Sequence, residues 1–439
     1  SATPLNTEAY QVTGTVVPNG NYQSVANAKG EVFITASVGR PPIKESTLVK
    51  GHYDASGKFV IDKQITPAAA ADGKGVNGVY GVAVDDANVS NTRQNTVAVY
   101  KQSDLSLVKQ YPANAVTHAR AMRVIGDSVY VTEAARGKGG GIKVFNAKQL
   151  DAAPTTIDLP EGAVPMDFDV DSASGRLFTV DMNLNKAYVI DTKNSNQVTS
   201  YDLPGANGAS GVAYDPANNR LFVANQSSNN AVVLDLGTGK VITDIPTGSQ
   251  PLGAVYSNGY VYVVNRAAGT VSVINASSLK VEAILPAGTN PNHLSVNPDG
   301  SVNVVDKAAS NNQIFRIARK GATPTPTTPV PAPTSSPTAA PTAAPVPTAP
   351  ASPTAKPSAP ASPAPTNPAK PNASATAPVT ITPLPGKDTG APLQPKGAAN
   401  QTEGGRPSLA KTGASSIVGL AALALIGVGA FMLRSRRRA

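Results

Sequence analysis

The chain has 439 residues, with 39 prolines, 38 glycines and neither cysteine nor tryptophan. Its length allows two or three domains, and this much proline and glycine argues against a mostly helical protein. The lack of cysteine excludes disulfide bonds and thiolate chemistry. Residues 1–321 carry 27 basic against 26 acidic side chains, so the net charge of +9 arises almost entirely nearer the C-terminus. A near-neutral N-terminal part lacks the electrostatic footprint of a nucleic-acid-binding protein, and no nucleic-acid partner is expected.

The chain begins with Ser1, and no charged and apolar leader precedes it. This start favours a numbering that begins after a removed secretory signal peptide. Residues 9–17, which include Tyr10 and several Val and Thr residues, have the composition of a β-strand.

An apolar pentad that ends in a short polar side chain recurs along residues 1–320. Clear copies are 129–133, 177–181, 221–225, 261–265 and 302–306, with weaker copies at 32–36 and in the segment that ends at 89–91. The steps between copies are 40 to 55 residues, which suits about four short strands per unit. Alternating apolar residues bounded by Asn, Asp, Gly and Pro predict antiparallel strands with tight turns. Seven such units predict an all-β fold, a seven-bladed β-propeller.

The last unit is one strand short, because the chain leaves strand-like sequence after Ile317. We expect residues 9–17 to supply the missing strand, which would close the last blade and remove exposed sheet edges. The alternative is an open ring of six blades.

The pentads Leu221–Asn225 and Val261–Asn265 resemble the YVTN family of propeller repeats. The resemblance covers about residues 20–320 and is strongest in residues 164–306. It implies a seven-bladed propeller, and the absence of tryptophan argues against the WD40 type. The first two units depart from the pattern, so their boundaries stay open.

Propeller ligands usually bind at the mouth of the central channel, which is lined by the loops that lead into each innermost strand. Those loops hold His118, Arg120, Asp167 and His293. We predict that these four side chains meet at a polar mouth that suits an anionic or hydroxyl-rich ligand such as a glycan. The alternative is that they satisfy turn and inter-blade hydrogen bonds.

The polar residues that end the pentads have a more local explanation. A short polar side chain at the end of a strand accepts hydrogen bonds from turn amides, which predicts a structural role. The set is Glu133, Asp181, Asn225, Asn265 and Asp306.

Strong catalytic motifs are missing from residues 1–320. The glycine-rich segment 137–141 lacks the Gly-Lys-Ser/Thr of a phosphate-binding loop, and residues 167–171 lack the glycine and distal glutamate of a calcium loop. The chain has three histidines and no recognisable metal cluster. No catalytic residue, metal or cofactor is therefore expected.

Residues 321–408 contain 23 of the 39 prolines and no aromatic side chain. Such a segment cannot bury enough apolar surface to offset the entropy of ordering, which predicts a disordered stalk rich in polyproline II conformation.

The C-terminus predicts membrane insertion and processing. The uncharged residues 414–433 are long enough for one transmembrane helix, and the basic tail 434–439 places that end in the cytoplasm. The preceding residues Leu409, Ala410, Lys411, Thr412 and Gly413, with this span and tail, resemble the sorting signal of class E sortases of high-GC Gram-positive bacteria (actinobacteria). The resemblance implies cleavage after Thr412 and transfer of that residue to peptidoglycan. The alternative is a single-span membrane protein with a chance pentapeptide.

These features together favour a secreted, cell-wall-anchored protein whose propeller binds an extracellular ligand, such as a glycan or host protein, in adhesion or recognition. The expected partners are a sortase, peptidoglycan and, before processing, the membrane. A surface hydrolase or lactonase is the alternative, since seven-bladed propellers of similar repeat include lactone-opening enzymes. A wall protein without a ligand is a third possibility.

Overall fold

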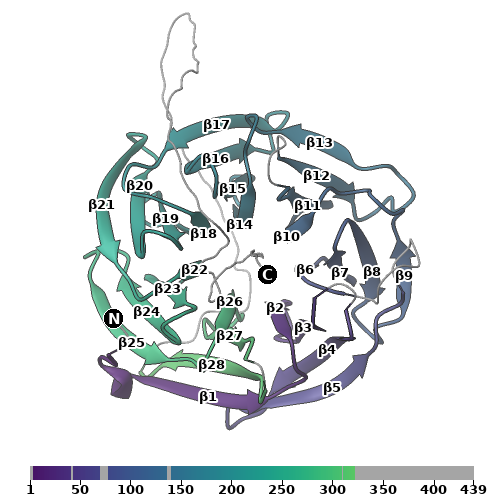
Figure 1. Ribbon diagram of the computed structural model, residues 1–439, viewed down its shortest axis with the longest axis horizontal. Helices are drawn as coiled ribbons and strands as arrows, with labels where there is room; N and C mark the ends of the chain where they lie inside the picture. Colours follow the sequence, from purple (N-terminus) through teal and green to yellow (C-terminus); the bar gives the residue numbers. More distant parts are fainter. Residues whose placement is uncertain (1–2, 41–42, 70–77, 136–139, 309, 322–439) are drawn as a thin grey trace, which may run out of the picture. The chain divides into compact units, whose positions relative to one another are not determined.

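The computed structural model describes residues 3–40, 43–69, 78–135, 140–308 and 310–321. This part of the chain is all-β: its 28 strands form seven four-stranded antiparallel sheets. One short 3₁₀ helix, η1 (Thr7–Ala9), precedes the first strand. The sheets are the blades of a ring (Figure 1), so the predicted seven-bladed propeller is confirmed. The described part holds no helix that is long and apolar enough to cross a membrane. The expected stalk after Gly321, the sorting motif, the membrane helix and the basic tail lie outside the described residues.

Each of the first six blades is built from four consecutive strands. Blade 1 has β2 (Asn21–Ala26), β3 (Val32–Val38), β4 (Glu45–Tyr53) and β5 (Phe59–Ile65). Blade 2 has β6 (Val82–Val84), β7 (Asn88–Arg93), β8 (Thr96–Lys101) and β9 (Leu107–Gln110). Blade 3 has β10 (Ala119–Ile125), β11 (Ser128–Glu133), β12 (Gly141–Asn146) and β13 (Thr155–Asp158). Blade 4 has β14 (Pro165–Asp171), β15 (Arg176–Asp181), β16 (Lys186–Asp191) and β17 (Gln197–Asp202). Blade 5 has β18 (Ala209–Asp215), β19 (Arg220–Asn225), β20 (Asn230–Asp235) and β21 (Lys240–Pro246). Blade 6 has β22 (Pro251–Ser257), β23 (Tyr260–Asn265), β24 (Thr270–Asn275) and β25 (Val281–Pro286).

Blade 7 joins the two ends of the propeller. It contains β26 (Pro291–Val296), β27 (Val302–Asp306), β28 (Gln313–Arg319) and, at the outer edge, β1 (Tyr10–Val16). Strand β1 runs antiparallel to β28 over seven residue pairs, from Tyr10 opposite Arg319 to Val16 opposite Gln313. The N-terminal segment thus supplies the strand that the last unit lacks and closes the ring (Figure 1).

The apolar pentads are buried on both faces, because each lies on a second strand between two neighbouring blades. In β19, Leu221 and Val223 pack into a core with Phe178 of blade 4. The intervening Phe222 faces the other way and packs with Val261 of blade 6. Successive side chains of a strand point to opposite faces, so a strand that is covered on both sides must be apolar throughout. This geometry explains why the pentads do not alternate with polar residues.

The innermost strands of six blades are irregular at their first residues. Their register shifts at Tyr22, at Arg120 and Ala121, and at Met166, Ser210, Leu252 and Asn292. A bulge re-aims side chains and increases the local twist. These strands surround the centre of the ring (Figure 1), so bulges in them alter which of their side chains face that centre.

Candidate functional site

The bulged residues form a connected group at one mouth of the channel. Arg120 of blade 3 donates from Nη1 to the Tyr22 hydroxyl of blade 1 at 2.9 Å, and from Nε to the Met166 carbonyl of blade 4 at 3.0 Å. Asn292 of blade 7 donates to the Tyr22 carbonyl at 2.8 Å. Four blades therefore meet through Tyr22 and Arg120, and this network fixes both side chains.

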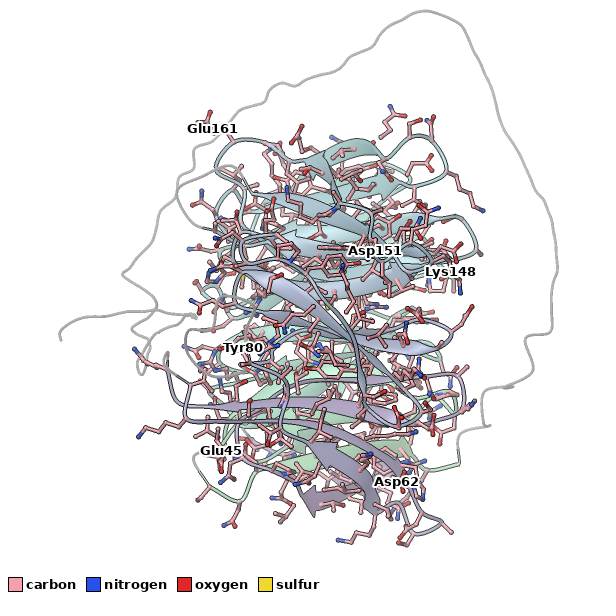
Figure 2. All side chains as sticks on the ribbon, turned by 90° about the vertical axis from the view of Figure 1, so that its right-hand side faces the viewer. Glu45, Asp62, Tyr80, Lys148, Asp151 and Glu161 are labelled. Atoms are coloured by element: carbon pink, nitrogen blue, oxygen red, sulfur yellow. The ribbon has the colours of Figure 1, made fainter. Side chains whose placement is uncertain are left out.

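The mouth lies toward the face that carries Tyr80. The Tyr80 ring meets the Tyr22 ring edge to face, with centroids 5.2 Å apart. In Figure 2, Tyr80 lies to the left with Glu45 and Glu161, whereas Lys148 lies on the right. Glu161 belongs to the connection into an innermost strand, and Lys148 belongs to the connection between the two outer strands of blade 3. The candidate site is thus on the face where innermost strands begin.

Two further cations join this group from blades 6 and 7. Arg266 directly follows β23 and Lys307 directly follows β27. Arg266 Nε donates to Asn290 Oδ1 at 3.1 Å, and Asn290 Nδ2 donates to the Lys307 carbonyl at 3.1 Å. The Lys307 ammonium lies 4.9 Å from the centroid of the Tyr22 ring, a cation–π distance. Arg120, Arg266 and Lys307 thus gather around one tyrosine, and we call these three residues the mouth cations.

The electrostatics at the mouth are those of crowded positive charges. Burial lowers the pKa of Lys307 to about 7, and repulsion from Arg266, Arg40 and Arg120 adds to this effect. Burial also lowers the pKa of the Arg266 guanidinium, with a further lowering from Arg120 that Tyr22 opposes. Arg40 follows β3 and is exposed to solvent, but nearby protein still lowers its pKa.

A second group, around Arg123, lines the channel wall. Burial raises the pKa of Asp167 to about 6, while the Phe168 amide, Arg123 and Arg120 act in the opposite direction. Burial lowers the pKa of His293 to about 3, and the positive charges of Arg120 and Arg123 add to this lowering. The imidazole is therefore neutral at pH 7. The Ser24 amide donates to Nδ1 of that imidazole at 3.4 Å.

Arg123 differs from the mouth cations because it has a carboxylate partner. Arg123 Nη2 lies 3.0 Å from Asp169 Oδ1. The other oxygen of Asp169 accepts the Tyr214 amide at 2.7 Å, which ties this pair to blade 5.

The structure brings together three of the four side chains predicted for the mouth. Arg120 acts electrostatically on both Asp167 and His293. His118 instead occupies an exposed turn before β10 with a left-handed backbone, φ 53°. Its amide donates to Asn95 Oδ1 and its carbonyl accepts from the Ala134 amide.

Sequence reasoning missed Tyr22, Arg40, Arg266 and Lys307. A usable signal existed for two of them, because Arg266 and Lys307 each directly follow a pentad. Tyr22 is marked only by the bulge that turns it toward Arg120, and Arg120 is 98 positions away in the sequence.

The polar pentad ends are mostly structural, as predicted, with one correction. Asp181 Oδ1 accepts three amides, those of Val164, Asn183 and Leu184. Asp306 likewise accepts the Asn290 amide, and Glu133 accepts the Thr117 amide.

Asn225 and Asn265 do not act as acceptors of turn amides. Both donate through Nδ2, Asn225 to the Val223 carbonyl and Asn265 to the Ser272 hydroxyl. Their Oδ1 atoms are buried without a hydrogen-bond partner in the described part of the chain. The prediction was wrong for these two residues because an amide offers donors that a carboxylate lacks.

Groups of three or more His, Asp or Glu side chains that could hold a metal ion do not occur in the part of the chain that the structure describes. Asp167 and His293 both feel the charges of Arg120 and Arg123, and Asp167 also feels that of Asp169.

Comparisons with known proteins support the fold alone. No family model and no curated protein matches the sequence. Among solved structures, a streptogramin B lyase is similar with a TM-score of 0.55 at 16% identity, over 70% of this chain and 97% of that one. Virginiamycin B lyase from Staphylococcus aureus gives a TM-score of 0.55 at 15% identity, over 70% and 99%. Hydrazine synthase of Kuenenia stuttgartiensis gives 0.56 at 14% identity, over 69% and 96%. At these identities the likeness shows a seven-bladed propeller and carries no function.

Proposed function

We propose that this protein is displayed on the cell surface and binds an extracellular ligand at the channel mouth of its propeller. The observation that carries the proposal is the convergence of Tyr22, Arg120, Arg266 and Lys307 from four blades on one mouth. Ligand sites combine a few precisely placed polar groups with a concave surface, and the blades of a propeller surround a central channel.

The surface display rests on the C-terminal sequence. The pentapeptide 409–413, the uncharged span 414–433 and the arginines after it stand in the order of a sortase sorting signal. A proline-rich stalk before this signal would carry the propeller away from the membrane, because polyproline II rises about 3 Å per residue. Reach and covalent attachment suit adhesion or recognition.

A Thr412→Ala variant tests the anchoring. In a host with a class E sortase, the wild-type chain should fractionate with peptidoglycan, and the variant should move to the membrane or medium. Thr402→Ala changes a neighbouring threonine outside the pentapeptide and should behave as wild type. Wall attachment of the Thr412→Ala chain would refute the sorting mechanism.

A glycan and matrix-protein screen with the full chain tests the binding site. Arg120→Gln should abolish binding of a ligand that the wild type takes, because Arg120 links three blades at the mouth. The control is Gln197→Ala in a groove of about 240 Å³ on the side of blade 4, lined also by Thr199 and Tyr201. Loss of binding in the groove variant alone would move the site from the mouth to the blade side.

An enzyme is the second candidate, favoured by Asp167. A buried carboxyl with a pKa near 6 can exchange protons near neutral pH. The test is to measure turnover of lactones and of quinupristin. Quinupristin is the compound present in the structure of one fold neighbour, an inactive virginiamycin B lyase. Turnover that disappears in Asp167→Asn would favour the enzyme over the binding protein.

A further inference from the structure

The geometry points to an oxyanion site at the channel mouth, in which Arg120, Arg266 and Lys307 bind a sulfate, phosphate or carboxylate group of the ligand. This inference rests on the proposed function and names the chemistry of its ligand.

Among the residues that the structure describes, no carboxylate pairs with a mouth cation. Every ion pair in the described part of the chain involves other residues. Arg123 provides an internal comparison, since it lines the same channel and is neutralised by Asp169 at 3.0 Å. Positive charges that protein structure holds together and does not neutralise mark a place for an external anion.

The mouth cations also have donors to spare. Arg120 uses Nε and Nη1 for Met166 and Tyr22, and Arg266 uses Nε for Asn290. Within the described residues no acceptor engages Nη2 of Arg120, the two Nη atoms of Arg266 or the Lys307 ammonium. Guanidinium groups in a fixed fork bind oxyanions in a bidentate manner, and the ammonium adds a point charge.

The supporting network favours an immobile site over a patch of mobile surface cations. Asn290 bonds to Arg266 and to the backbone of Lys307, and Asp306 holds the Asn290 amide at 2.7 Å. The Tyr22 hydroxyl accepts from Arg120, so its own proton can be donated to the bound oxyanion. A site of this kind loses little side-chain entropy when its ligand binds.

Repulsion among the mouth cations supports the same conclusion. The charges of Arg266, Arg40 and Arg120 add to burial in lowering the pKa of Lys307. A bound oxyanion would relieve this repulsion and favour the protonated lysine.

Sulfate is the simplest probe, because it stays a dianion over the working pH range. The full chain, held in non-ionic detergent because of its apolar C-terminal span, is titrated with sulfate by calorimetry at pH 6.5 and constant ionic strength in chloride. Lys307→Gln and Arg266→Gln should each weaken binding at least tenfold, whereas Lys307→Arg should retain it. The matched control is Lys240→Gln, which removes an exposed lysine from the outer strand β21 and should change affinity less than twofold.

Two larger probes distinguish the source of the oxyanion. A sulfated disaccharide and glycerol phosphate are each compared with the uncharged parent compound. Preference for either charged probe, lost in Lys307→Gln, supports the site and identifies its ligand. Equal sulfate affinity in wild type, Lys307→Gln and Lys240→Gln, or no sulfate binding at all, would overturn the oxyanion site.

Failure of this inference is distinct from failure of the proposed function. An uncharged glycan that binds the wild type and is lost only in Arg120→Gln would leave a ligand-binding mouth but refute the oxyanion chemistry. Native melting temperatures of the Gln variants ensure that lost binding is not lost folding.

Discussion

Binding of sulfate at the channel mouth should weaken as the pH rises above 7. Lys307 has its pKa lowered to about 7 by burial and by the neighbouring arginines, so the free protein loses this charge near neutrality. The Arg266 guanidinium stays protonated where Lys307 titrates, because its lowered pKa of about 9 still lies above that of Lys307. Because the bound dianion favours the charged lysine, binding above pH 7 must take up one proton.

The size of the effect follows from that single proton. Above the pKa of the free lysine, the affinity should fall by about tenfold per pH unit, and by up to about a hundredfold between pH 7 and 9. The fall ends when the pH passes the pKa of Lys307 in the complex, which cannot greatly exceed about 10.4, the value of an unperturbed lysine.

Calorimetric titrations with sulfate at pH 5.5, 7, 8 and 9 measure the profile. Lys307→Arg should bind at all four values with little change above pH 7, and Lys307→Gln should bind weakly with an equally flat profile. A tenfold fall per unit that persists in Lys307→Arg would refute the assignment of the proton to Lys307.

Asp167 should also change the sulfate affinity, below pH 7, and its effect has to be distinguished from that of Lys307. Its pKa of about 6 means that it gains a negative charge between pH 5 and 7, which should weaken sulfate binding in that window. Asp167→Asn should remove this part of the profile and leave the part above pH 7. His293, whose pKa is lowered to about 3, stays neutral throughout and should not contribute.

Two stability predictions concern the ring itself. Tyr10 is 5% exposed at the junction of blades 6 and 7, so Tyr10→Ala should lower the free energy of unfolding by about 3 kcal/mol. Tyr10→Phe, and Gln11→Ala at an exposed position of the same strand, should cost little. Equal denaturation midpoints for the Tyr10 and Gln11 alanine variants would contradict closure of the ring by β1. Asp181→Ala leaves three amides and the Tyr188 hydroxyl without their acceptor and should lower the free energy of unfolding by about 3 kcal/mol. Asp181→Asn keeps one acceptor oxygen and should cost less. A native melting temperature for the alanine variant would show that these hydrogen bonds to the turn are dispensable.

The fold could be predicted because every blade repeats the same burial. A second strand between two blades is apolar on both faces, as Leu221 and Phe222 show by packing into different cores. Because this burial recurs in each blade, a similar apolar pentad recurs along the sequence. The closing strand could be inferred in turn, because a unit that ends at β28 without a fourth strand needs one from elsewhere.

The mouth could be predicted only in part. Position in the repeat was enough to select Arg120, Asp167 and His293, because the loops before innermost strands must meet at one face. Tyr22 reaches Arg120 through a bulge, and a one-residue register shift leaves no mark in composition. His118 lies in an exposed turn with a left-handed backbone directly before β10, and its place at the mouth stays a prediction.

The internal repeat itself argues that the mouth cations are functional. The residue that follows the second strand makes the same backbone bond in five blades: the amides of Ala134, Met182, Gln226, Arg266 and Lys307 donate to the preceding loop at 2.9 or 3.0 Å. This backbone hydrogen bond therefore forms whichever side chain the residue carries. On blades 4 and 5 this position holds Met182 and Gln226, which contact each other at 3.3 Å between Sδ and Nε2.

On blades 6 and 7 the same position holds two cations that repel each other. A structural requirement common to the blades cannot explain a difference between them, and packing alone would favour the uncharged pair. The asymmetry places two positive charges on neighbouring blades, and Lys307 lies against the ring of Tyr22, whose hydroxyl accepts from Arg120. Exchanging Arg266 and Lys307 for the residues of blades 4 and 5, as Arg266→Gln with Lys307→Met, should therefore raise or preserve the unfolding free energy while abolishing sulfate binding. A double variant that loses stability instead would assign these cations to the fold.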